Sequence, residues 1–221
     1  FVVTDIDEST DPPTAWLSRT IVQQKAQDRL LDSLRPGDVI PARVTHLEPF
    51  GAFVDAGCRV PSLIGIENLS VSRICHPSDR LTVGQSILAA VRTVEPENRR
   101  ISLTHRELLG TWAQNAALFS VGETVRGVVR SIEPYGVFIE LTPNLSGLAE
   151  PRADLRPGMA VSVYIKSILP QRMKVKLTII DVLSPYDAPT PPRYFITEGH
   201  INEWTYTPVG CDKKPVKTVF E

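Results

Sequence analysis

The sequence predicts a mainly β protein built from two small barrels in tandem. The first observation is a duplication: the stretch from Val44 to Asp55 recurs eighty-five positions later, from Val129 to Glu140, with the same Glu-Pro-aromatic-Gly-x-Phe core. A period this long indicates a duplicated domain rather than a solenoid repeat. The second observation is that aliphatic residues alternate with other residues in both copies. Such alternation is typical of strands that place one face in a core.

Composition sets the broad class. Of the 221 residues, 42% are apolar and 22% charged, which is ordinary for a globular protein with room for two small domains and extensions. No apolar run is long enough to predict a transmembrane helix. Cys58, Cys75 and Cys211 are scattered, which favours free thiols in a reducing compartment, the cytoplasm, and no zinc site. Because the chain starts at Phe1 rather than Met, we expect a fragment or a processed chain.

Charge is nearly balanced, at −1 for the chain. Lys and Arg minus Asp and Glu give 9 − 8 = +1 for residues 35–109 and 8 − 6 = +2 for residues 121–183. The N-terminal 34 residues give 3 − 6 = −3. Any affinity for phosphates is therefore expected to be modest.

The N-terminal part, residues 1–34, reads as an acidic lead-in followed by a helix. Residues 1–13 are rich in Asp, Ser, Thr and Pro and are expected to be extended and poorly ordered. A helix is predicted over Ala15–Leu34, with Asp11 or Thr14 as its cap. Its partial apolar stripe is expected to pack against the first barrel.

Residues 35–109 predict the first barrel. Five short strands with inward aliphatic residues indicate a small Greek-key barrel of the OB type. The polar stretch Asn68–Leu81 suits short helical turns between the third and fourth strands. The strands are expected over residues 38–47, 50–56, 62–66, 85–94 and 100–104.

An amphipathic helix is predicted over residues 105–119, overlapping the end of the first barrel, with Trp112 in the core or at a domain interface. A second, shortened OB-type barrel follows over residues 120–183, with its fifth strand at Lys174–Thr178. The eleven residues missing from this copy come from between the third and fourth strands. Residues 184–221 are expected to form a Pro-rich linker and a small β-meander tail that docks on the second barrel.

Each copy places a pair of aromatic residues near one glycine. A β-bulge at Gly51 or Gly136 would bring both rings to the outer face of the second strand. Two adjacent exposed rings on a small barrel form a stacking platform for unpaired bases. The alternative is that one ring only plugs the end of the barrel. The rings are those of Phe50, Phe53, Tyr135 and Phe138.

These residues resemble the RNA-binding repeat of ribosomal protein S1, a family of five-stranded OB barrels. The resemblance covers residues 35–109 well and 121–183 in shortened form. It implies single-stranded RNA as the partner, in translation or RNA metabolism, and possible contact with a ribosome or RNA-processing complex. It also implies that the four rings bind RNA together with the basic residues that begin the fifth strands, Arg100 and Lys174. Secondary RNA contacts are expected at Arg43, Arg73, His76, Arg126 and Lys176.

The family's third-strand histidine is replaced by Gly65 in the first copy and by Glu150 in the second. A carboxylate there would oppose phosphate, whereas a glycine only forgoes a contact. We therefore expect the first repeat to bind RNA more tightly, and Glu150→His to strengthen the second.

The sequence contains no recognisable catalytic or metal-binding motif, so we expect a non-enzymatic protein with no cofactor and no metal. The alternatives are a protein-interaction adaptor on a ribosome or RNA-processing complex, with RNA contact secondary, and an accessory part of an enzyme whose catalytic domain lies elsewhere. No membrane partner is expected.

Overall fold

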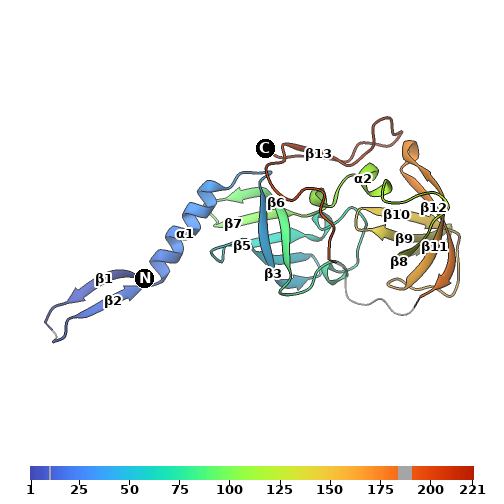
Figure 1. Ribbon diagram of the computed structural model, residues 1–221. Helices are drawn as coiled ribbons and strands as arrows, with labels where there is room; N and C mark the ends of the chain where they lie inside the picture. Colours follow the sequence, from blue (N-terminus) through green and yellow to red (C-terminus); the bar gives the residue numbers. More distant parts are fainter. Residues whose placement is uncertain (10, 184–190) are drawn as a thin grey trace.

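Two closed five-stranded barrels lie side by side, and an N-terminal arm projects from the first (Figure 1). The structure is a computed structural model that describes residues 1–9, 11–183 and 191–221. The predicted mainly β class with two OB-type barrels is confirmed. The domain limits expected from the sequence remain predictions.

The first barrel closes in the order β3-β4-β5-β7-β6. All neighbouring strands are antiparallel except β5 and β7, which run parallel. Its core is aliphatic and includes Val44, Ile64 and Leu103, all at most 1% exposed. Short 3₁₀ turns η1 (Ile66–Asn68) and η2 (Pro77–Asp79) occupy the connection that the sequence predicted to be polar turns. The strands are β3 (Val39–Glu48), β4 (Gly51–Asp55), β5 (Pro61–Gly65), β6 (Ser86–Glu95) and β7 (Arg100–Thr104).

The second barrel repeats this topology, in the order β10-β12-β11-β8-β9. The connection between its third and fourth strands, residues 150–159, is short and has no helical turn. The deletion inferred from the sequence therefore falls where it was expected. A further 3₁₀ turn, η4 (Pro170–Arg172), joins the last two strands. The strands are β8 (Thr124–Glu133), β9 (Gly136–Thr142), β10 (Leu145–Ala149), β11 (Ala160–Leu169) and β12 (Lys174–Val182).

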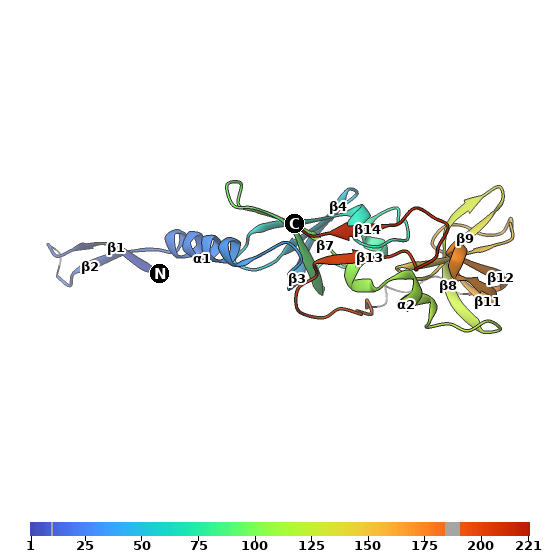
Figure 2. The same cartoon turned by 90° about the horizontal axis from the view of Figure 1, so that it is seen from above.

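The N-terminal arm differs from the prediction. The expected lead-in contains a strand, β1 (Val2–Asp7), which pairs as a hairpin with β2 (Thr14–Ser18) at the start of the expected helix. Helix α1 (Thr20–Ser33) therefore starts later than predicted. Neither expected cap is used, because both lie in the hairpin. The last turns of α1 do pack on the first barrel, where Leu31 is 3% exposed within its core. The rest of the arm extends away from both barrels (Figures 1 and 2).

The connecting helix is shorter than predicted. The segment 105–119 splits into a 3₁₀ turn, η3 (Arg106–Leu109), and a five-residue helix, α2 (Trp112–Ala116). Gly110, with φ +84°, separates them, because this left-handed conformation cannot continue a right-handed helix. Thr111 then caps α2 by accepting a hydrogen bond from the backbone N–H of Gln114. Trp112 is 3% exposed and lies in an apolar cluster that joins the second barrel to the tail, in agreement with the predicted core or interface position.

The C-terminal tail lies across both barrels rather than on the second alone, which corrects the prediction. The strands of its small sheet are β13 (Glu203–Thr205) and β14 (Lys217–Val219), and no strand forms over 194–197. On the first barrel, Ile201 donates a backbone hydrogen bond to Gly37. On the second, the Tyr206 hydroxyl donates to the carbonyl of Asn144 at 2.6 Å. The greater part of the expected linker, residues 184–190, lies outside the described residues.

Candidate nucleic-acid interface

Each barrel carries a pair of adjacent aromatic rings on its outer surface. The ring centroids of Phe50 and Phe53 are 6.0 Å apart with the planes at 88°, and those of Tyr135 and Phe138 are 6.2 Å apart at 90°. This edge-to-face arrangement is a favoured one for aromatic pairs. Phe50 is 56% exposed and Tyr135 is 66% exposed, whereas the partner ring of each pair is half-buried. One ring of each pair is therefore open to solvent, and the other supports it.

The backbone brings the rings together in a different way from the one predicted. Gly51 and Gly136 pair in register with the neighbouring strand, so neither forms a bulge. The register shift lies on that neighbouring strand, at Thr45 in β3 and at Arg130 in β8. The first ring of each pair belongs to the turn before its strand, where the alternation of faces does not apply.

Gly51 has a different role, which is to let two strands approach closely. A Cβ atom at this position would lie 2.4 Å from the carbonyl oxygen of Ile64 in β5. The carbonyl of Phe50 also accepts a backbone hydrogen bond from Ile66 at 2.9 Å. The turn that carries the exposed ring is therefore held against β5, which preorganises the ring position.

The basic residues lie on the same outer surface but at different distances from the rings. In the second barrel Phe138 pairs with Leu148, and Leu148 pairs with Lys176, so the lysine shares the row of the ring. Lys174 lies two residues further along β12. In the first barrel the corresponding row ends at Ser102, and Arg100 lies two residues away from it. All three basic side chains are exposed.

The other expected secondary contacts are less well placed. Arg43 donates from its side chain to the carbonyl of Gly84 at 3.1 Å. The His76 ring caps η2 by accepting from the backbone N–H of Ser78, so it serves the local turn. Arg73 is exposed on the same connection. Arg126 lines a cavity between the barrels instead of flanking the rings.

A carboxylate occupies the third-strand position in both copies. A Cβ atom built on Gly65 would lie 2.6 Å from Oε1 of Glu67, so the carboxylate of that residue fills the space that the sequence left empty. In the second copy Glu150 is exposed and forms a salt bridge with Lys166 of 3.2 Å. The first copy therefore also has a carboxylate close to this position, although it belongs to Glu67.

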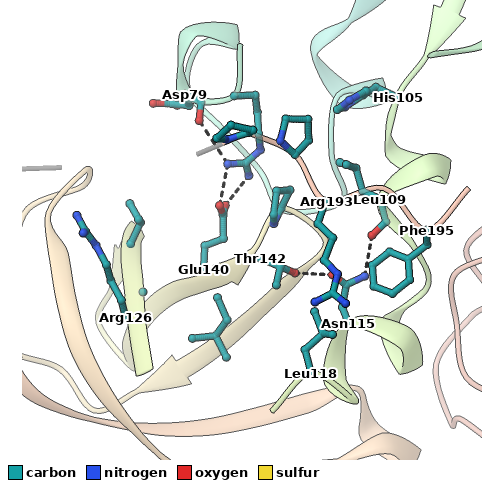
Figure 3. A pocket seen from close by; sticks show the side chains of 17 residues that line it. Asp79, His105, Leu109, Asn115, Leu118, Arg126, Glu140, Thr142, Arg193 and Phe195 are labelled. Carbon is teal, nitrogen blue, oxygen red and sulfur yellow. Dashed lines mark hydrogen bonds and ion pairs between the residues drawn. The ribbon is translucent and has the colours of Figure 1, made fainter. Parts of the chain in front are cut away.

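The most tightly bound charges lie between the barrels, around a cavity of 390 Å³ (Figure 3). Glu140 of β9 is 6% exposed and accepts from Arg80 of the first barrel at 2.7 Å and from Arg130 of β8 at 2.9 Å. Asp79 adds a second carboxylate, 3.5 Å from Arg130. The charges of these four side chains therefore neutralise one another across the junction. No motif or spacing in the sequence indicated this role of Glu140, because Arg80 lies sixty positions away in the chain.

Two further buried polar residues join segments that are far apart in the chain. The Asn144 side chain is fully buried, and its Nδ2 donates to the carbonyls of Arg106 and Gly110 at 2.8 and 2.7 Å. His105 is 1% exposed, with Nδ1 3.0 Å from the carbonyl of Leu69 and Nε2 3.0 Å from the Tyr194 hydroxyl. A carbonyl can only accept, so Nδ1 carries the proton and the tyrosine donates to Nε2. Burial lowers the pKa of His105 to about 4, and the ring is neutral.

Two classes of site have no support in the described part of the chain. Residues 1–9, 11–183 and 191–221 contain no group of three or more His, Cys, Asp or Glu residues placed to hold a metal ion. Among the helices that the structure describes, none combines the length and the apolar character that crossing a membrane requires. The paired rings and their basic neighbours are therefore the candidate site.

Comparison with known proteins identifies relatives of this chain. Residues 33–106 match the family model of the S1 RNA binding domain. Small ribosomal subunit protein bS1 of Staphylococcus aureus (strain COL) is 32% identical over 190 residues, which cover 78% of this chain and 48% of that protein. The bS1 protein of Staphylococcus saprophyticus is 30% identical over 193 residues with the same coverages. The chain thus spans about half the length of the curated relatives it matches.

Among solved structures, GSP13 from Bacillus subtilis is 27% identical with a TM-score of 0.33, covering 38% of this chain and 60% of that one. The resemblance to repeats of the S1 type seen in the sequence is confirmed, by the family model over residues 33–106 and by the bS1 relatives.

Proposed function

We propose that this protein binds single-stranded RNA through the outer faces of both barrels, without catalysis, and that it does so in translation or RNA metabolism in the cytoplasm. The observation that carries the proposal is the duplicated ring pair, which has nearly the same geometry in both barrels. The names of the family and of the relatives describe RNA binding and a ribosomal subunit, which supports the same assignment and a ribosomal partner.

Stacking is the interaction that this geometry suits best. Phe50 and Tyr135 present more than half of their surface to solvent, and their half-buried partner rings hold them edge to face. A base stacked on such a ring contributes about 1–3 kcal/mol and needs no particular base identity. Two platforms on one chain therefore favour an unpaired strand over a duplex, whose bases are already stacked.

Phosphate contacts would come from the basic side chains beside the rings. Arg100, Lys174 and Lys176 are exposed on β7 and β12. Because few charges are engaged, the loss of affinity with salt should be shallow, at about 0.7 in log–log slope for each phosphate neutralised. The adaptor hypothesis has no observation of its own in the described residues.

The test removes the exposed ring from each barrel. Phe50→Ala and Tyr135→Ala truncate side chains that are largely in solvent, so the fold should be retained. Each change should lower the affinity for a pyrimidine-rich single-stranded RNA about 5- to 150-fold, which corresponds to 1–3 kcal/mol. Filter binding measures the affinity, and circular dichroism checks the fold.

Val209→Ala is the matched control, because this exposed apolar residue lies in the C-terminal tail and belongs to neither ring pair. It should bind like the parent protein. Unchanged affinity in the Phe50→Ala, Tyr135→Ala double variant, with the fold intact, would rule out the stacking platforms.

A further inference from the structure

The outer face of β9 leads from the second ring pair, Tyr135 with Phe138, into the cavity between the barrels, here called the junction cavity (Figure 3). Residues two apart on a strand share a face, so Glu140 and Thr142 follow Phe138 on the same side of β9. Both line the cavity, and so does Arg126 of the neighbouring β8. A strand rises about 3.4 Å per residue, which separates Glu140 from Phe138 by only about 7 Å along the strand. The cavity is therefore a continuation of the ring-bearing face.

The wall of the junction cavity has more cationic than anionic groups. Its two carboxylates form ion pairs with Arg80 and Arg130, and these four groups balance in charge. Two more guanidinium groups line the same cavity, one from β8 and one from the tail, and both side chains are exposed to solvent. An anion that enters from solvent therefore meets an excess of positive charge. The two additional arginines are Arg126 and Arg193.

The tail holds Arg193 in a defined place. Its guanidinium carbon lies 5.8 Å from the centroid of the Phe195 ring, within the range of a cation–π contact. The backbone N–H of Phe195 donates to the carbonyl of Leu108 at 2.8 Å. The ring also packs so closely on Gly110 that a Cβ atom there would lie 2.5 Å from it. The arginine therefore reaches the cavity from a fixed segment, which reduces the conformational entropy lost when it binds an anion.

We propose that the junction cavity binds backbone phosphates of the RNA strand that stacks on the second ring pair, with Arg126 and Arg193 as the phosphate-binding residues. The inference rests on the proposed function and extends it to a second site. A guanidinium group suits a phosphate because it presents two parallel N–H donors. Figure 3 shows the two arginines on opposite sides of Glu140, so a chain of phosphates meets both more readily than one small anion does.

The experiment measures RNA affinity by filter binding over a range of salt concentrations. The probe is a pyrimidine-rich single strand of about twelve nucleotides, within the site size of an OB fold. Arg126→Gln and Arg193→Gln each remove one charge from an exposed side chain, so the fold should be retained, and circular dichroism checks it. Each variant should bind the RNA a few-fold more weakly and have a log–log salt slope that is smaller by about 0.7.

Arg29→Gln is the matched control, because it removes an exposed guanidinium group from α1, on the N-terminal arm. It should leave both the affinity and the salt slope unchanged. The same affinity and slope in Arg29→Gln and in the two cavity variants would overturn the proposal.

A second arm distinguishes the RNA backbone from a free phosphate compound. Inorganic pyrophosphate is titrated by calorimetry into the parent protein and into the double variant Arg126→Gln, Arg193→Gln. The parent should bind pyrophosphate more weakly than it binds the RNA, because pyrophosphate has no base to stack on the rings. A double variant that lost pyrophosphate binding and kept the parental RNA affinity and slope would assign the cavity to a free phosphate compound, against the proposal.

The ring variants separate failure of this inference from failure of the proposed function. Suppose that the Phe50→Ala, Tyr135→Ala variant bound RNA more weakly while the arginine double variant kept the parental affinity and slope. The cavity site would then be wrong and the stacking platforms would stand. Parental RNA affinity in both double variants would overturn both.

Discussion

The two barrels have kept the same ring geometry and diverged in the charges around it. The rings in each pair lie 6.0 or 6.2 Å apart and nearly perpendicular. In the row of paired strand residues that contains the half-buried ring, however, the first barrel has Ser102 where the second has Lys176. The first barrel also places Glu67 in the space next to Gly65, whereas Glu150 of the second is paired with Lys166. Because the nearby charges favour the second barrel, we now expect it to bind RNA more tightly than the first, which reverses the ranking inferred from the sequence.

The same comparison shows how one position can take two roles. Asp55 and Glu140 are equivalent in the duplication. The Asp55 carboxylate lies near the surface, where Oδ1 accepts from the backbone N–H of Gly57 at 2.9 Å. Glu140 is buried between two guanidinium groups, one of which comes from the other barrel. In the second barrel this position faces the first barrel, so the Glu140 carboxylate lies in the junction, whereas the Asp55 carboxylate stays near the surface.

The largest expected effect comes from neutralising this pair of positions. Glu140→Gln leaves Arg80 and Arg130 buried with too little negative charge, so the free energy of unfolding should fall by about 3–5 kcal/mol. Asp55→Asn keeps the oxygen that accepts from Gly57 and should change stability by less than about 0.5 kcal/mol. Urea denaturation, followed by the fluorescence of the buried Trp112 and Trp204, measures both. Similar losses in the two variants would show that the junction ion pairs add nothing.

Acid should destabilise the protein through His105, which has Ile179 as its counterpart in the second barrel. The pKa of His105 is lowered to about 4, first by desolvation and then by Arg80, while the Leu69 carbonyl and Glu107 act in the opposite direction. Between pH 6.5 and 4 the unfolded chain therefore binds a proton at this residue and the folded chain does not. Stability should fall through this window as the pH is lowered, by on the order of 3 kcal/mol.

The control for this prediction is His105→Gln, which keeps an amide able to donate to the Leu69 carbonyl and does not titrate. Its unfolding free energy, measured by urea denaturation at several pH values, should depend less on pH between 4 and 6.5. Parallel profiles for the parent and the variant would exclude His105 as the source of the acid sensitivity.

The smallest effect is expected from exchanging the residues beside the rings. Ser102→Lys should strengthen RNA binding and Lys176→Ser should weaken it, each by a few-fold, because a single exposed charge is screened by salt. The log–log salt slope should change by about 0.7 in opposite directions. Lys214→Ser, which removes an exposed lysine of the tail, serves as the control and should leave the slope unchanged. If all three variants had the same RNA affinity and the same salt slope, positions 102 and 176 would have no special part in binding.

Local patterns in the sequence were sufficient for the barrels and for the choice of rings. Alternation along strands depends on residues two apart, so it predicted the five strands of the first barrel to within one residue at each end, and the start of β12. The pairing of Phe50 with Phe53 was also correct, although its cause was not. The predicted bulge at Gly51 gave way to a turn before β4, because turn geometry depends on contacts with β5 that local sequence does not report.

The N-terminal helix and the connecting helix show the limit of helical periodicity. Ala15–Ser18 fits an apolar stripe, but it pairs with β1 instead, since a hairpin satisfies its backbone groups across the strand. In the connection, the left-handed conformation at Gly110 interrupts a pattern that otherwise continues on both sides. Neither outcome could be read from spacing alone.

The sequence by itself determined the mainly β class, the duplication, the shortened second copy and the identity of the four rings, because these depend on short-range alternation and on repetition. Only the tertiary structure decided the roles of Glu140, Asn144 and His105, the placement of the tail across both barrels, and the carboxylate beside Gly65. The physical reason is that a buried polar side chain is specified by partners far away in the chain. Arg80 and Glu140 are sixty positions apart, and His105 meets Tyr194 across eighty-nine.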